Sequence, residues 1–135
     1  GADGWQLSNP PILALAPLRV SLEIFHRAGL SRLREKSLAL TGHLETLVRR
    51  HLGGIIDIVT PPEPERRGCQ LSLRVKAGRD AGRALFDYLA DRGIVGDWRE
   101  PDTIRIAPTP LYNRHVDSLR FVQATQDWVA GHSKA

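Results

Sequence analysis

The apolar residues change their spacing at Gly53 and Gly54. Before this pair, leucines recur every seven residues, which predicts a long amphipathic helix over residues 31–51 with Ser31 as its N-cap. After it, residues 55–59 (IIDIV) form a β-branched run that predicts a short buried strand. The change of period means that this chain packs helices against a sheet.

The remaining patterns predict the other elements. Three further helices are expected, over residues 12–28, 80–93 and 116–130; the second of these starts with Asp80 as its cap and ends at Gly93. Further strands are expected over residues 71–75, 94–95 and 103–107. In the last helix, Leu119, Val122 and Val129 are predicted to face inward. This order predicts an α+β fold in a single domain, residues 1–135: a small, mostly antiparallel sheet with helices packed on one face.

Composition excludes several classes of protein. No apolar run approaches the roughly 20 residues that span a bilayer, and the single cysteine, Cys69, cannot form an internal disulfide. The net charge of +4 comes from arginines scattered through every segment, whereas nucleic-acid binders gather such charge on one face. We therefore expect a soluble cytoplasmic protein that binds neither membrane nor nucleic acid. The chain has no methionine and begins at Gly1, which fits either a processed start or a piece of a longer protein.

Motifs for catalysis and metal binding are sparse. The five histidines are spread along the chain, and no two of them have the His-x-x-x-His spacing of one helix turn, so no metal site is expected. Arg105 stands out because the period of two places it opposite Ile104 and Ile106, on the other face of their strand. It either forms a structural ion pair or binds a carboxylate with its guanidinium fork. Asn9, held before Pro10, either starts a turn or points its amide at a ligand.

Four blocks of sequence are familiar: GWQLSNPP at residues 4–11, SLEIF at 21–25, RGCQL at 67–71 and RIAPTPLYN at 105–113. In order and spacing they resemble the carboxy-terminal third of kynureninase, from residue 4 to about 130. The resemblance implies the small domain of a fold type I, aspartate-aminotransferase-like enzyme that depends on pyridoxal phosphate. It also implies a homodimer that hydrolyses L-kynurenine or 3-hydroxy-L-kynurenine to L-alanine and an anthranilate in tryptophan degradation.

The same resemblance assigns roles to two residues. It places Arg105 on the α-carboxylate of the substrate. It places Asn9 at the cofactor and substrate-ring end of the site, near a subunit boundary, where its amide serves either the phosphate or the aryl group. None of Lys36, Lys76 and Lys134 matches the lysine block of the family, so the cofactor lysine is expected in a large domain outside this chain. The chain alone is therefore expected to be inactive.

Two other functions remain open at this stage. A cysteine desulfurase or another enzyme of the same fold type would also place an arginine on a substrate carboxylate. A free-standing, non-catalytic domain that binds an acidic partner would fit the positive net charge and the missing lysine.

Overall fold

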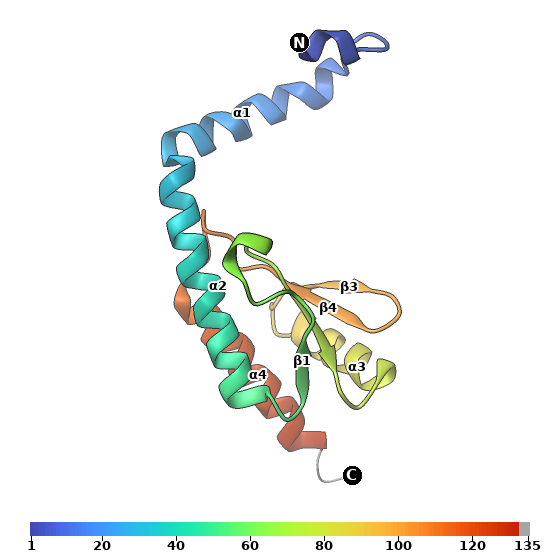
Figure 1. Ribbon diagram of the computed structural model, residues 1–135. Coiled ribbons are helices and arrows are strands. Elements are labelled where there is room, and N and C mark those ends of the chain that lie inside the picture. The colour runs from blue at the N-terminus through green and yellow to red at the C-terminus, as the bar shows by residue number, and fades with distance from the viewer. Residues whose placement is uncertain (133–135) are drawn as a thin grey trace. The chain divides into compact units, whose positions relative to one another are not determined.

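A computed structural model describes residues 1–132 of the chain (Figure 1). The elements follow in the order η1 (Ala2–Trp5), α1 (Ile12–Ala28), α2 (Leu30–Leu52), β1 (Ile56–Ile58), η2 (Pro64–Arg66), β2 (Leu71–Val75), α3 (Arg79–Ala90), β3 (Asp97–Arg99), β4 (Thr103–Ile106) and α4 (His115–His132). Apart from the two 3-10 turns, this is the order that the sequence predicts. No helix among residues 1–132 has the length and apolar character of a membrane span.

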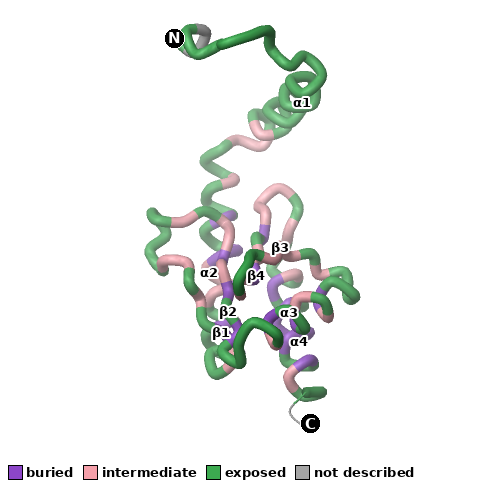
Figure 2. Tube along the Cα trace, turned by 90° about the vertical axis from the view of Figure 1, so that its right-hand side faces the viewer, coloured by how far each residue is buried: buried purple, intermediate pink, exposed green. Residues whose placement is uncertain are grey.

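The chain divides into two compact units, Gly1–Leu33 and Arg34–Ala135. The first unit holds η1, α1 and the start of α2. None of residues 12–28 is buried, as the colouring of Figure 2 shows. The apolar side of α1 is therefore exposed, with Leu18 at 49% and Leu22 at 60% of their full accessible area.

Gly29 separates the first two helices and corrects one prediction. Its φ of 82° is a conformation that favours glycine, and its N–H donates to the Phe25 carbonyl at 2.9 Å. Its own carbonyl accepts the N–H of Leu33 at 3.0 Å, so the second helix begins at once, at Leu30. The prediction that Ser31 is the N-cap was wrong because Gly29 already serves both helix ends.

In the second unit, four antiparallel strands form one sheet in the order β1-β2-β4-β3. The alternation predicted for residues 71–75 is confirmed, with Leu71, Leu73 and Val75 buried on one face. This face packs against the helices in a single core (Figure 2). The core comprises Leu44, Val48, Leu52, Ile56, Leu71, Leu73, Val75, Leu85, Leu89, Ile104, Phe121, Val122, Ala124 and Trp128. The α+β prediction is confirmed.

Two local predictions near α3 were wrong. Gly78 rather than Asp80 is the N-cap of α3, with a φ of 98° and a carbonyl that accepts the Gly82 N–H at 3.0 Å. Residues 94–95 are not a strand, because the Ile94 N–H is bound to the Leu89 carbonyl at the end of α3. The third strand follows at Asp97–Arg99.

In α4, the inward-facing side is rotated from the one that the sequence predicts. Leu119 is 40% exposed, whereas Phe121, Val122 and Trp128 are buried. Val129 is only partly buried and packs against the core. The buried positions 118, 121, 122, 125 and 128 recur every three or four residues and form one stripe, and Leu119 lies at its edge, so the prediction is confirmed for Val122 and wrong for Leu119.

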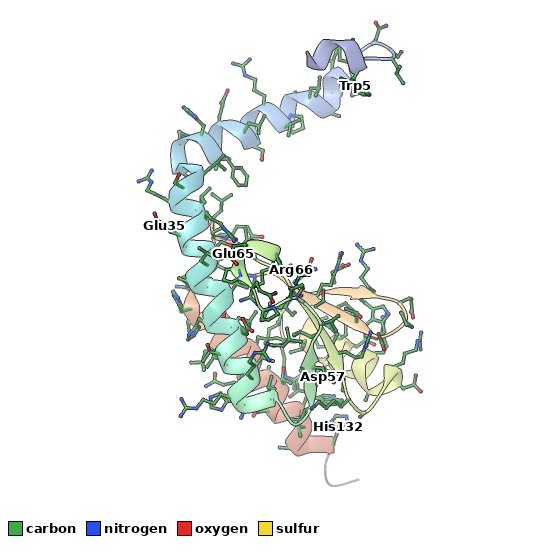
Figure 3. All side chains as sticks on the ribbon, in the orientation of Figure 1. Trp5, Glu35, Asp57, Glu65, Arg66 and His132 are labelled. Atoms are coloured by element: carbon green, nitrogen blue, oxygen red, sulfur yellow. The ribbon has the colours of Figure 1, made fainter. Side chains whose placement is uncertain are left out.

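The proline-rich segment after β1 is tied to α2 by a buried ion pair. Arg67 donates to Glu45 of α2, and their side chains are only 7% and 14% exposed. Arg34 of α2 also donates to the backbone carbonyls of Pro64 and Arg67, at 2.5 and 3.3 Å. Figure 3 shows Glu65 of the same segment beside α2. Polar contacts with α2 therefore hold this loop in place.

Candidate functional site

Arg105 lies in the middle of β4, on the polar face of the sheet. Its direct neighbours across the sheet are Ser72 on β2 and Asp97 on β3. Ile104, next to it in sequence, is buried on the opposite face, as the period of two predicts. The side chain of Arg105 is 31% exposed, so it is held by its neighbours and still reached by solvent.

The partner of Arg105 in this structure is Asp97. Arg105 donates through both Nε and Nη2 to Oδ2 of Asp97. Arg99 donates through Nε to the same oxygen at 2.9 Å. The hydrogen bond from Arg105 is the largest effect that lowers the pKa of the Asp97 carboxyl group, and the bond from Arg99 adds to it. The ion pair that the sequence left open is thus present.

The charges of this cluster do not cancel. Two guanidinium groups share one carboxylate, so Arg99, Arg105 and Asp97 together carry one excess positive charge. Among the described residues, no acceptor contacts Nη1 of Arg105. A guanidinium can bind a carboxylate through two parallel hydrogen bonds, and one edge of the fork remains for this. The arrangement therefore suits the binding of a second carboxylate.

The chain after β4 forms a tight turn that leads into α4. The Asn113 side-chain oxygen accepts the N–H of Thr109 at 2.8 Å, and Asp117 accepts the N–H of Arg114 at 2.9 Å. That backbone hydrogen bond, followed by one from the Asn113 side chain, lowers the pKa of Asp117. Asn113 thus stabilises the entrance to the helix, whereas Tyr112 is 73% exposed.

A cavity of about 420 Å³ lies beside this turn, between α2, α4 and the end of β4. Ile106 and Ala107 line it, but Arg105 does not, because its side chain is on the other face of the strand. The Ser118 hydroxyl also lines it and has no hydrogen-bond partner among the described residues. The cavity is therefore separate from the guanidinium cluster.

Asn9 lies in the first unit, and its side chain is exposed. Three residues before Asn9, Gln6 donates from its side chain to the Ser8 carbonyl at 2.9 Å. Arg105 belongs to the second unit, so the two predicted site residues come from different units.

Among residues 1–132, the two lysines do not fit a pyridoxal phosphate site. Lys36 is exposed on α2, and Lys76 is exposed with its Nζ bonded to the Gly53 carbonyl at 2.8 Å. Lys134 lies outside the described residues. Nor do three or more His, Cys, Asp or Glu side chains gather as a metal site within residues 1–132. A Schiff-base lysine needs a buried or otherwise activated amine, which neither described lysine offers.

Sequence reasoning missed Asp97 and Arg99 as members of the cluster. Both lie on β3, a three-residue strand that begins three residues after the start that the apolar pattern predicts. Their register against β4 is a non-local property that the spacing of residues does not encode. The one signal in the sequence was general: an arginine within a strand needs an acidic partner, and that partner must lie on a neighbouring element.

Comparisons with known proteins agree with this fold. Residues 33–125 match the family model of the kynureninase C-terminal domain. The chain is 66% identical over 128 residues to the kynureninase of Stenotrophomonas maltophilia (strain K279a), covering 95% of this chain and 30% of that protein. It is 61% identical over 130 residues to the kynureninase of Xanthomonas campestris pv. campestris (strain B100), covering 96% and 31%. The chain thus spans about 30% of the length of these relatives.

Solved structures share the fold at low sequence identity. A NifS-like protein superposes with a TM-score of 0.60 at 20% identity, over 75% of this chain and 30% of that chain. A glycine decarboxylase (P-protein) of the glycine cleavage system superposes with a TM-score of 0.56 at 22% identity, over 76% and 23%. These neighbours have the architecture of fold type I enzymes, which the sequence resemblance implies. Taken with the family match and the close relatives, they show that the chain belongs to the kynureninase family, in its C-terminal domain.

Proposed function

We propose that this chain is the carboxy-terminal part of a kynureninase. The complete enzyme hydrolyses the bond between the β and γ carbons of L-kynurenine or its 3-hydroxy form. The products are L-alanine and anthranilate or 3-hydroxyanthranilate, in tryptophan degradation. The enzyme is a cytoplasmic homodimer in this proposal. Membership of the family and 66% identity to a curated kynureninase support it over a cysteine desulfurase or a free-standing binding domain.

Within that enzyme, this chain supplies the substrate carboxylate clamp. The observation that carries the proposal is the Arg105 fork, which is held by Asp97 on the polar face and retains one unfilled edge in a cluster of net positive charge. Two parallel hydrogen bonds to the α-carboxylate fix the rotation of the amino acid as well as its position. Fixing the substrate in this way lowers the entropy cost of reaching the reactive geometry.

The cofactor of the complete enzyme is pyridoxal phosphate, held by polypeptide outside this chain. Neither Lys36 nor Lys76 has the buried setting that a cofactor lysine needs. When bound, pyridoxal phosphate supplies the electron sink for cleavage of the substrate. Arg105 contributes binding and orientation of the substrate, not proton transfer.

We expect the isolated chain to release no anthranilate from L-kynurenine, and the full-length enzyme to release it. The physical reason is that binding and orientation alone cannot replace the cofactor and its lysine. The measurement is anthranilate fluorescence with added pyridoxal phosphate, for the chain and the full-length enzyme at equal concentration. L-Cysteine serves as a second substrate. Anthranilate release and a pyridoxal absorbance band from the chain alone, or turnover of cysteine only by the full-length enzyme, would contradict the proposal.

We further propose that Asn9 contacts the phosphate of the cofactor or the aryl end of the substrate. Replacing Asn9 by alanine in the full-length enzyme removes one hydrogen bond. It is expected to weaken the binding of the molecule that Asn9 contacts about tenfold. If the phosphate is contacted, the affinity for pyridoxal phosphate falls, and the activity on both substrates falls by the same factor. If the aryl end is contacted, the KM values for L-kynurenine and 3-hydroxy-L-kynurenine rise by different factors.

Ser8→Ala is the matched control for Asn9, because it changes the neighbouring residue of the same turn. Its effect on cofactor affinity and on both KM values is expected to be less than about twofold. An Asn9→Ala enzyme with unchanged cofactor affinity and unchanged KM values would remove Asn9 from the site.

A further inference from the structure

Asp97 occupies one defined edge of the Arg105 guanidinium. The two residues are direct partners in the register of β3 and β4, so their side chains leave the sheet on the same face. The contact uses Nε and Nη2, which form one side of the fork. The end of the fork that Nη1 and Nη2 form together is the other place where a carboxylate can bind in two-pronged fashion.

We propose that Asp97 is a positioning residue for substrate binding: it holds Arg105 by the Nε edge, so that the Nη1–Nη2 end receives the substrate carboxylate. This inference rests on the proposed function of Arg105. Asp97 itself does not touch the substrate. Its role is to fix the plane and direction of the guanidinium before the substrate arrives.

The alternative role for Asp97 is that of a competitor that the substrate must displace. Two features favour positioning. Asp97 contacts only one edge of the fork, so the substrate carboxylate can bind while the ion pair remains. Arg99 donates to the same Asp97 oxygen at 2.9 Å, which offsets the negative charge that Asp97 would otherwise present to an incoming anion.

Without Asp97, the long side chain of Arg105 regains its rotamers. Arginine side chains lose considerable entropy when they are held in one geometry, and this loss would then be paid during substrate binding. A clamp that is not held by its neighbours is also too loose to align a substrate well. The two roles therefore predict opposite changes in KM. Removing Asp97 raises KM if Asp97 is a positioning residue, and lowers KM if Asp97 is a competitor.

The test uses the full-length enzyme with the variants Asp97→Ala, Asp97→Asn and Asp97→Glu, together with Arg105→Ala and Arg74→Ala. We expect Asp97→Ala to raise the KM for L-kynurenine about tenfold, with kcat changed less than about threefold. Asp97→Asn, which keeps an acceptor oxygen without the charge, is expected to lie between Asp97→Ala and the wild type. Asp97→Glu is expected to restore most of the affinity, and it covers the case in which Asp97→Ala does not fold.

A second readout separates positioning from general damage to the fold. The α-carboxamide of kynurenine lacks the charged carboxylate, so its inhibition constant is expected to change less than about twofold in the Asp97 variants. Arg74→Ala is the matched control, because it removes an arginine of the same sheet face that is paired with Asp102 and not with Asp97, and it is expected to change KM less than about threefold.

Unchanged or lowered KM values in the Asp97 variants, alongside a raised KM in Arg105→Ala, would overturn the positioning role and leave the clamp intact. A KM unchanged in Arg105→Ala would overturn the clamp itself. Loss of affinity for the carboxamide equal to that for L-kynurenine would show a structural role for Asp97, and would also overturn the inference.

Discussion

Replacing Arg105 by alanine in the full-length enzyme is expected to raise the KM for L-kynurenine about 100-fold. Removing one partner of a charged, hydrogen-bonded pair costs about 3 kcal/mol when the pair is shielded from water, which corresponds to a factor of about 100. The loss falls on substrate binding and alignment, because Arg105 handles no proton. The measurement is steady-state kinetics on L-kynurenine, with the absorbance of bound pyridoxal phosphate as a check on cofactor loading.

Two further variants sharpen this test. Arg105→Lys keeps the charge without the planar fork, so about a tenfold rise in KM is expected, because lysine cannot bind a carboxylate bidentately. Arg74→Ala removes another arginine on the same face of the sheet, one that is paired with Asp102, and should change KM little. An Arg105→Ala enzyme whose KM stays within about twofold of the wild type would show that another residue binds the carboxylate.

Replacing Arg67 by methionine is expected to lower the free energy of unfolding by about 2 kcal/mol, because the largely buried Glu45 carboxylate then keeps only Arg49, which is itself 55% exposed, as a partner. The Arg67 side chain is 7% exposed and that of Glu45 is 14% exposed, so neither is well hydrated. The Pro61 carbonyl also loses its hydrogen bond from Arg67, at 3.4 Å. Urea unfolding of the wild-type chain and the variant measures the change.

The same ion pair predicts a dependence of stability on pH. Burial on its own would raise the pKa of Glu45, but the hydrogen bonds from Arg67 and Arg49 outweigh it and hold the pKa below its ordinary value. A carboxylate with a lowered pKa stabilises the fold fully above its ordinary pKa, and this stabilisation is lost as the pH falls through the lowered value. In Arg67→Met this acid-dependent loss should shrink.

The double variant Glu45→Gln, Arg67→Met is the control for this pair. It removes both charges, so it should be more stable than Arg67→Met alone, because no carboxylate then remains largely buried with Arg49 as its single partner. Equal stability of Arg67→Met and the wild type would show that the proline-rich segment is held by other contacts, such as those of Arg34.

Local periodicity was enough to predict most of the secondary structure. The limits of α1 and β2 match the sequence pattern because each follows from apolar spacing and from residues such as Gly29 that end an element. The predicted caps at Ser31 and Asp80 were wrong because each helix begins one or two residues earlier, directly after a glycine with positive φ, Gly29 or Gly78. The strand at residues 94–95 was mistaken because a tertiary contact, with the end of α3, overrides the preference of two apolar residues.

The candidate site was predictable only in part. Alternation along a single strand places Arg105 on the polar face, and this needs no knowledge of other strands. Its partner Asp97 depends on how β3 pairs with β4, which is set by turn geometry and packing that are distributed along the chain.

The most direct measurement is a crystal structure of the full-length enzyme with an unreactive kynurenine analogue bound. We expect both carboxylate oxygens of the analogue to lie about 3 Å from the Nη1 and Nη2 atoms of Arg105, with Asp97 still bonded at the Nε edge. An analogue whose carboxylate is bound by other side chains, with Arg105 remote from it, would contradict the assignment of Arg105 as the substrate clamp.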